Sequence, residues 1–250
     1  MLTLGSKVTK FELPREQSVA PYFRLSWITG CYEREIIALY SQILRPGMRV
    51  IDIGAHVGYH TIRFAKLVGS EGKVFAFEPC PSTFEVLCRN VRRQTLANVV
   101  LEQKAVSDAS GQVDLFVGRH NLRHSTVPVG NIWVKVDSVS LDDYLRGEVI
   151  HLVKIDVEGA ELKVLRGMGS LMDTVPDITL ILEFYPDLLR ASEGEDGPVE
   201  LLNLLRDSGF YLYEIQERQL VALESFGSLE KFVSSVHKLT NLFACKSPWQ

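Results

Sequence analysis

The sequence lacks the features that mark several classes of protein. No stretch approaches the roughly 20 consecutive apolar residues that cross a bilayer, and the start of the chain shows no apolar segment typical of a signal peptide. Cysteine is sparse, and no pair has the Cys-x-x-Cys or other spacing of a zinc site. The cysteines are Cys31, Cys80, Cys88 and Cys245. We therefore expect a cytoplasmic protein that does not contact a membrane and whose thiols stay reduced.

An excess of positive charge is also absent. The net charge is -4, with 27 Lys and Arg against 31 Asp and Glu. Proteins that bind nucleic acid usually present a basic face. The local cluster Arg89, Arg92 and Arg93 repeats at helical spacing, which is typical of a solvated helix surface. We expect a small molecule, and no nucleic acid, as the binding partner.

Strand and helix signals alternate along the chain. Short apolar runs rich in β-branched residues, such as 48–53 and 73–77, are each followed by a segment of helical periodicity, 57–68 and 81–94. This alternation indicates a parallel sheet with helices on both faces.

The overall organisation follows from length and composition. With 250 residues, 46% of them hydrophobic, the chain can bury one core. We expect an irregular segment over 1–30 and a single domain over 31–250. Two late strands, 210–215 and 239–245, suit an antiparallel hairpin at the edge of the sheet.

The first candidate site is a strand that runs into a glycine turn and then a helix. Ligands of such sheets bind at the carboxyl ends of the strands, and Gly54 permits a tight turn with close approach of a ligand. A pyrophosphate site would need Gly-x-Gly-x-x-Gly, whereas the spacing here is Gly54-x-x-x-Gly58, with Asp52 at the strand end. An acid at this position suits a ligand that carries an ammonium and a sulfonium group.

The next strand ends in Glu78, followed by Pro79. An acid there accepts hydrogen bonds from ribose hydroxyls. Glu78 therefore supports an adenosine-containing ligand, whether S-adenosylmethionine or a dinucleotide. The glycine spacing favours S-adenosylmethionine over a dinucleotide. The rival interpretation, an NAD-dependent oxidoreductase, also lacks a Tyr-x-x-x-Lys pair for its chemistry.

These segments resemble one family. The chain contains DIGAHVG at 52–58, and KIDVEGAE at 154–161 followed by Val164-Leu165-x-Gly167. Together they resemble the FkbM family of S-adenosylmethionine-dependent methyltransferases, over roughly 31–215. His56 stands where that family commonly has asparagine.

The resemblance implies a fold and an activity. The implied fold is α/β, the Rossmann-like class I methyltransferase fold, with a mostly parallel seven-stranded sheet, helices on both faces and an antiparallel edge strand. The implied activity is O-methylation of a small-molecule hydroxyl, on a sugar or on a glycosylated or polyketide natural product. Residues 111–140 would form an insertion on the acceptor side. The alternative is a non-catalytic protein that binds S-adenosylmethionine.

The cofactor site predicted on this basis draws on both the glycine turn and the family motifs. Its residues are Glu33, Asp52, Gly54, Ala55, His56, Gly58, Tyr59, Glu78, Pro79, Ala105, Val106 and Asp156.

The second candidate site is acidic. In an extended segment, Asp156 and Glu158 would project to the same side, and Glu183 ends the neighbouring strand. These acids can act as a general base, hold a divalent cation, orient acceptor hydroxyls, or merely cap the next helix. We favour a base or a positioning role and predict no metal. The catalytic candidates are therefore Asp156, Glu158 and His124, the last in a polar loop that either covers the acceptor or is simply solvated.

Overall fold

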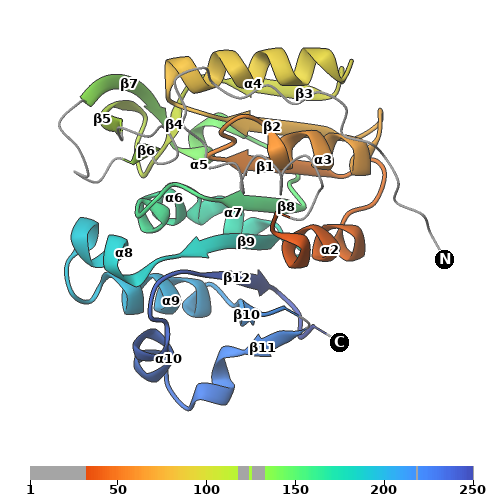
Figure 1. Ribbon diagram of the computed structural model, residues 1–250. Helices are drawn as coiled ribbons and strands as arrows, with labels where there is room; N and C mark the ends of the chain where they lie inside the picture. The colour runs from red at the N-terminus through yellow and green to blue at the C-terminus, as the bar shows by residue number, and fades with distance from the viewer. Residues whose placement is uncertain (1–31, 118–123, 126–132, 218, 250) are drawn as a thin grey trace.

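The computed structural model describes residues 32–117, 124–125, 133–217 and 219–249. Most of its strands form one twisted sheet, shown in Figure 1. Their order is β11 (Leu220–Ala222), β10 (Tyr211–Ile215), β12 (Thr240–Cys245), β9 (Thr179–Phe184), β8 (Leu152–Ile155), β1 (Arg49–Ile53), β2 (Lys73–Phe77) and β3 (Val99–Glu102). The predicted irregular segment over 1–30 lies outside the described residues.

The sheet is parallel from β3 to β9, and the late strands are antiparallel. β12 pairs antiparallel with both β9 and β10, and β11 pairs antiparallel with β10. The mostly parallel α/β sheet is thus confirmed, but the described residues form eight strands where seven were predicted. The additional strand, β11, was not recognised in the sequence because it has only three residues, too few to show an alternating pattern.

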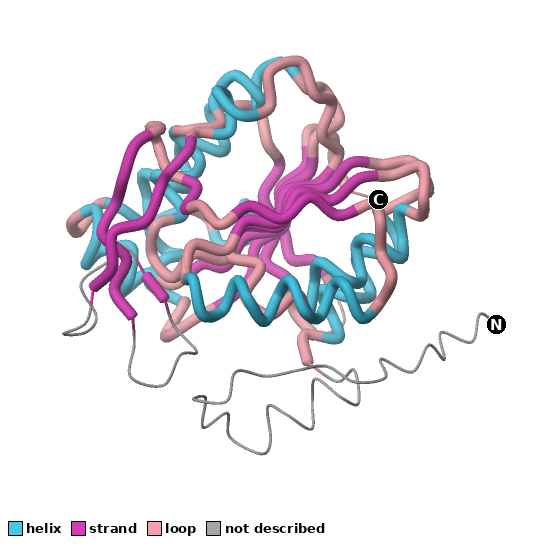
Figure 2. Tube along the Cα trace, turned by 90° about the horizontal axis from the view of Figure 1, so that it is seen from above, coloured by secondary structure: helices cyan, strands magenta, loops and turns pink. Residues whose placement is uncertain are grey.

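Helices cover both faces of the sheet, as Figure 2 shows from above. One face packs against α2 (Arg34–Ile43), α3 (Tyr59–Val68) and α4 (Pro81–Arg93). The other packs against α5 (Leu141–Tyr144), α6 (Glu161–Arg166), α7 (Gly169–Thr174), α8 (Pro186–Glu193), α9 (Gly197–Asp207), the 3₁₀ helix η1 (Leu223–Phe226) and α10 (Leu229–Ser235).

Alternate residues of the central strands explain the two layers. In β1, Ile51 and Ile53 join the core beneath α6 to α9, whereas Val50 packs with Phe64 of α3 on the opposite face. Strands buried on both faces read as continuous apolar runs because neither side meets water. The carboxyl ends of these rigid, buried strands are therefore well placed to hold a site.

A second, four-stranded sheet lies beside the main one. It consists of β4 (Ala105–Val106), β7 (Trp133–Val139), β5 (Gly111–Val117) and β6 (His124–Ser125), and it appears at the left of Figure 1. It includes the described part of the predicted 111–140 insertion.

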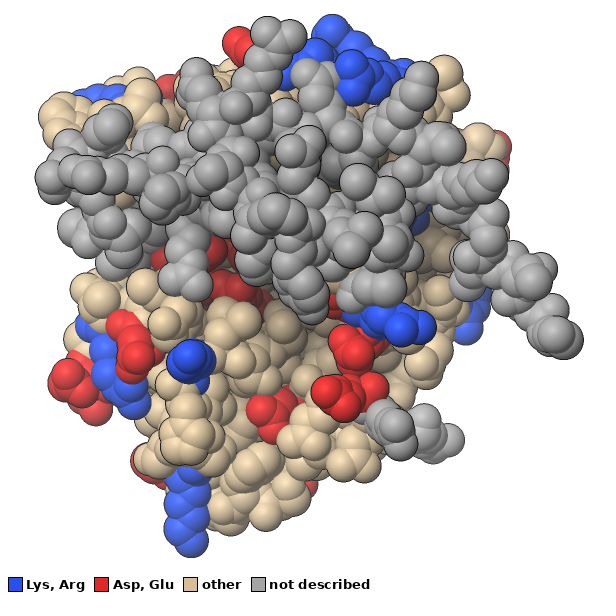
Figure 3. All heavy atoms as spheres, viewed as in Figure 1, with Lys and Arg blue, Asp and Glu red and all other residues tan. Residues whose placement is uncertain are grey.

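The structure places the basic cluster and most of the cysteines. Arg89, Arg92 and Arg93 are exposed, and Figure 3 shows basic side chains gathered over α4 at the top of the molecule. The cysteines of the described ranges, Cys80, Cys88 and Cys245, form no disulfide. None of the helices in these ranges combines the length and apolar character needed to span a membrane.

Candidate active site

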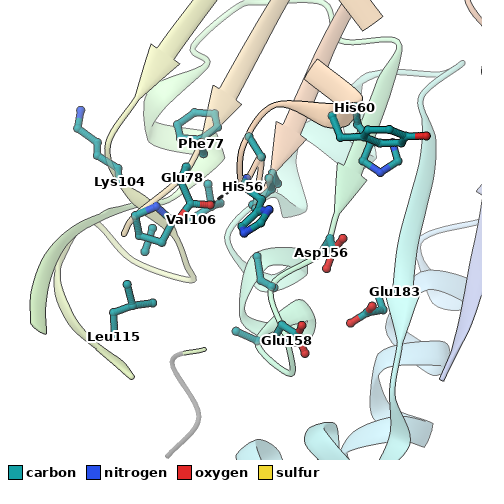
Figure 4. A pocket seen from close by; sticks show the side chains of 18 of the residues that line it. His56, His60, Phe77, Glu78, Lys104, Val106, Leu115, Asp156, Glu158 and Glu183 are labelled. Carbon is teal, nitrogen blue, oxygen red and sulfur yellow. Dashed lines mark hydrogen bonds between the residues drawn. The ribbon is translucent and has the colours of Figure 1, made fainter. Parts of the chain in front are cut away.

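A pocket of about 630 Å³ opens at the carboxyl ends of β1, β2, β8 and β9. This volume is in the range of pockets that hold cofactors and other small ligands. Figure 4 shows side chains from these strand ends pointing into it. Of the predicted cofactor residues, those that line it are Glu33, Gly54, Ala55, His56, Tyr59, Glu78, Pro79, Ala105, Val106 and Asp156.

The glycine turn joins three strands. The N–H groups of Gly54 and Ala55 both donate to the carbonyl oxygen of Phe77, at 3.0 and 2.9 Å. Gly54 has a φ of +78°, and a Cβ added there would lie 1.8 Å from the backbone oxygen of Asp156. Only glycine tolerates both the left-handed backbone and this contact. The turn therefore brings the ends of β1, β2 and β8 together at one point.

Glu78 is held in place by backbone groups. It is 3% exposed. Its Oε2 accepts the N–H of His56 and its Oε1 accepts the N–H of Cys80, each at 2.9 Å. Glu78 also lines the pocket, and a carboxylate has about four lone-pair sites for hydrogen bonds. This arrangement fits the predicted acceptor of ribose hydroxyls.

Two predicted cofactor residues do not line the pocket. Asp52 is fully buried, and one of its oxygens accepts the hydroxyl of Thr61 from α3. Gly58 precedes α3 with a φ of +90°, and a Cβ there would lie 2.8 Å from Leu87 of α4. Both therefore stand behind the pocket wall, where they support the turn.

The acids of the second candidate site converge. One carboxylate oxygen from each of Asp156, Glu158 and Glu183 lies within 4.8 Å of the others, and Figure 4 shows the three groups facing one space. The reason given from the sequence was wrong. β8 ends at Ile155, and Glu158 reaches the cluster through a left-handed turn, with a φ of +52°. The capping alternative also fails, because the residue at the N-cap of α6 is Ala160.

Sequence reasoning missed the partner of Asp156. Lys154 is 3% exposed, and its Nζ donates to Oδ2 of Asp156 at 2.7 Å. Burial acts to lower the pKa of Lys154, but the carboxylates of Asp156 and Glu33 outweigh it, and the pKa is raised. Lys154 is therefore charged, and its ammonium group lies against the carboxylate of Asp156. The sequence feature that could have indicated this pairing is a lysine inside an otherwise apolar buried strand.

Glu33 belongs to a buried polar chain that runs from the pocket wall to Tyr40. Its Oε2 lies 2.9 Å from Nε2 of His60, whose Nδ1 lies 2.9 Å from the hydroxyl of Tyr40. Burial acts to raise the pKa of Glu33, but His60 and Lys154 lower it to about 2. Glu33 is thus a second anion beside Lys154, and it keeps the lysine charged.

Glu161 holds the turn that carries Glu158. Its carboxylate accepts the N–H of Val157 at 3.2 Å and the N–H of Gly159 at 3.1 Å. Burial nevertheless raises its pKa to about 7. This role of Glu161 was not predicted from the sequence.

Glu183 is the other perturbed acid. Burial, followed by the charges of Asp156 and Glu158, raises its pKa well above the usual range. The position of His124 remains a prediction, because β6 is described but the side chain of His124 is not. The rest of its polar loop, 118–123 and 126–132, lies outside the described residues.

With the geometry established, similarity to known proteins decides the family. The profile of the Methyltransferase FkbM domain matches residues 52–212. The chain belongs to this family. The hexuronic acid methyltransferase AglP of Haloferax volcanii is 31% identical over 206 residues, which are 78% of this chain and 82% of AglP.

Solved structures show the same fold. Methyltransferase FkbM from Methylobacillus flagellatus superimposes with a TM-score of 0.52 at 15% identity, covering 89% of this chain and 53% of that one. A Streptococcus mutans protein described as a methyltransferase, in complex with SAH, gives 0.52 at 12% identity and covers 86% and 97%. The predicted class I fold, the FkbM family and the cofactor S-adenosylmethionine are thereby confirmed. The pocket fits this cofactor, because Glu78 presents a carboxylate fixed by two backbone N–H groups beside the Gly54 turn, and both line the pocket.

Proposed function

We propose that this methyltransferase acts on oxygen, transferring a methyl group to a hydroxyl of a small molecule, with a sugar or a glycosylated or polyketide natural product as the acceptor. The observation that carries the proposal is the cluster of carboxylates around Asp156, which lies in the same pocket as the cofactor residues. An alcohol must lose a proton when it is methylated, and a carboxylate at the site can receive it.

S-adenosylmethionine, when bound, supplies a methyl group already activated by its sulfonium, so the protein need only orient the acceptor and receive a proton. Glu78 and the Gly54 turn would hold the adenosine side. Asp156 would receive the proton or fix the acceptor hydroxyl. Its Oδ2 is bonded to Lys154, which leaves Oδ1 for the acceptor.

The class of acceptor is supported by the lining and by one relative. Carboxylates are good hydrogen-bond acceptors for hydroxyl groups, and a sugar offers several hydroxyls. AglP, the relative with 31% identity, carries a hexuronic acid in its name. The sheet β4–β7 contributes Leu115 and Ala105 to the pocket wall. We therefore propose that the 111–140 region borders the acceptor and that His124 contributes from it.

The test uses Asp156→Asn in the full chain. We expect unchanged affinity for S-adenosylmethionine by calorimetry and a methyl-transfer rate lower by roughly 10²–10⁴-fold, as for a lost general base. The matched control is Asp173→Asn, since Asp173 is exposed on α7 and does not line the pocket. Radiolabelled methyl transfer to a panel of monosaccharides and uronic acids supplies the assay.

Two outcomes would contradict the proposal. Normal turnover by a folded Asp156→Asn variant would remove Asp156 from the chemistry. Transfer to rRNA, with none to the hydroxyl panel, would overturn the small-molecule acceptor. The alternative of a non-catalytic binding protein predicts cofactor binding with no transfer to any acceptor.

A further inference from the structure

Three carboxylates gather at the acceptor end of the pocket. Asp156, Glu158 and Glu183 meet there, and Lys154 pairs with Asp156. Carboxylates that share one site disfavour each other's ionised form, and bound protons or a cation relieve this repulsion.

Glu183 provides an observation that is independent of the clustering. Its Oε2 is buried and has no hydrogen-bond partner among the described residues. The buried polar groups of proteins are nearly always satisfied, and an exception calls for a missing ion or water. Figure 4 shows the Glu183 carboxylate directed toward Asp156 and Glu158 and away from the strands behind it. The unsatisfied atom is therefore aimed into the cluster.

The spacing of the oxygens suits a metal ion. The three carboxylate oxygens lie within 4.8 Å of one another. At a metal–oxygen distance of about 2.4 Å, two oxygens on opposite sides of a cation are about 4.8 Å apart. Mg²⁺ binds oxygen at about 2.1 Å, so the carboxylates would move only slightly closer together to bind it. The ligand atoms come from the end of β8, the turn after it and β9, so that the backbone of a rigid sheet sets their separation.

The geometry points to a binding site for one divalent cation, held by Asp156, Glu158 and Glu183. All the ligands are oxygens, which favours Mg²⁺, Mn²⁺ or Ca²⁺ over zinc or copper.

The role of the cation rests on the proposed function, although its binding does not. A hard cation beside the cofactor would coordinate one or two acceptor hydroxyls and lower the pKa of the bound hydroxyl. A ligand with adjacent hydroxyls, such as a sugar, would fill the remaining coordination positions. The metal-free interpretation favoured from the sequence did not include the buried, unsatisfied Glu183 oxygen.

The experiment measures binding of Mn²⁺ to the EDTA-treated full chain without cofactor or acceptor. Loss of the sharp paramagnetic resonance signal of free Mn²⁺ reports the bound ion, and Mg²⁺ and Ca²⁺ are added as competitors. We expect one ion per chain. Glu183→Gln should weaken binding by at least roughly tenfold, the lower end of what even an outer-shell change costs a metal site.

The controls separate this proposal from the proposed function. Glu224→Gln should bind Mn²⁺ like the wild type, because Glu224 is exposed on η1, outside the pocket. Glu158→Gln serves as a second ligand variant, and circular dichroism checks that each variant is folded. No saturable binding up to millimolar Mn²⁺, or binding unaffected by both ligand variants, would overturn the cation site. Calorimetry with S-adenosylmethionine in EDTA tests the cofactor site separately.

Discussion

Replacing Glu161 by glutamine should change how the stability of the protein depends on pH. Burial raises the pKa of Glu161 to about 7 in the folded protein, from an ordinary value of 4.5. The unfolded chain therefore releases this proton first as the pH rises. Since the folded state binds more protons across this interval, the free energy of unfolding falls between about pH 4.5 and pH 7.

The magnitude follows from the shift. A difference of about 2.5 pKa units corresponds to about 3 kcal/mol at 1.36 kcal/mol per unit. Between pH 5 and pH 8, Glu161 alone should lower the free energy of unfolding by about 2.5 kcal/mol, since the unfolded carboxyl is already partly ionised at pH 5. Glutamine does not titrate, so Glu161→Gln removes this contribution. The hydrogen bonds lost to the turn add an offset that does not depend on pH.

The assay is urea unfolding of the wild type, Glu161→Gln and Glu224→Gln at several pH values from 5 to 8, with EDTA present so that no cation contributes. We expect the wild type to lose stability relative to Glu161→Gln as the pH rises, and the exposed Glu224→Gln control to follow the wild type. Parallel curves for the wild type and Glu161→Gln would show that the carboxyl is not destabilised by burial, and would refute the reasoning.

Two further predictions concern the cofactor side of the pocket. Glu78→Ala should weaken binding of S-adenosylmethionine by roughly 5- to 150-fold, or about 1–3 kcal/mol, because it removes the ribose acceptor and leaves the N–H groups of His56 and Cys80 unpaired; calorimetry with unchanged affinity would contradict this. Gly54→Ala should abolish cofactor binding and lower the melting temperature, because its Cβ would lie 1.8 Å from the oxygen of Asp156 at a φ of +78°; a variant with wild-type melting and affinity would show that the turn relaxes at no cost.

The architecture was largely predictable because its signals are local. The largely apolar run Arg49–Ile53 indicates a buried strand. Pro81 marks the start of the helix that follows β2, because proline is common at the first position of a helix. The late strands were also recognised, with β12 antiparallel to its neighbours as expected. The three-residue β11 was missed, since pairing with β10 defines it and no pattern of its own does.

The cofactor side of the site was partly predictable, and the acidic side much less so. Gly54 and Glu78 stand next to strand ends, and the position of a strand end follows from the local sequence. Asp52 lies near the end of β1, two residues before Gly54, but its side chain faces Thr61 of α3. Which face of a strand meets the ligand depends on how the whole sheet is covered, and no local pattern contains that information.

By itself, the sequence determined the strand, the glycine turn and the acid at the end of the next strand, because each depends on backbone conformation within a few residues. Only the tertiary structure decided which charges meet. Lys154 pairs with Asp156, and Glu183 approaches Glu158, through strand register and one left-handed turn. Electrostatic interactions act through space and depend on burial, so the balance of charge at the acceptor end appears only once the chain has folded.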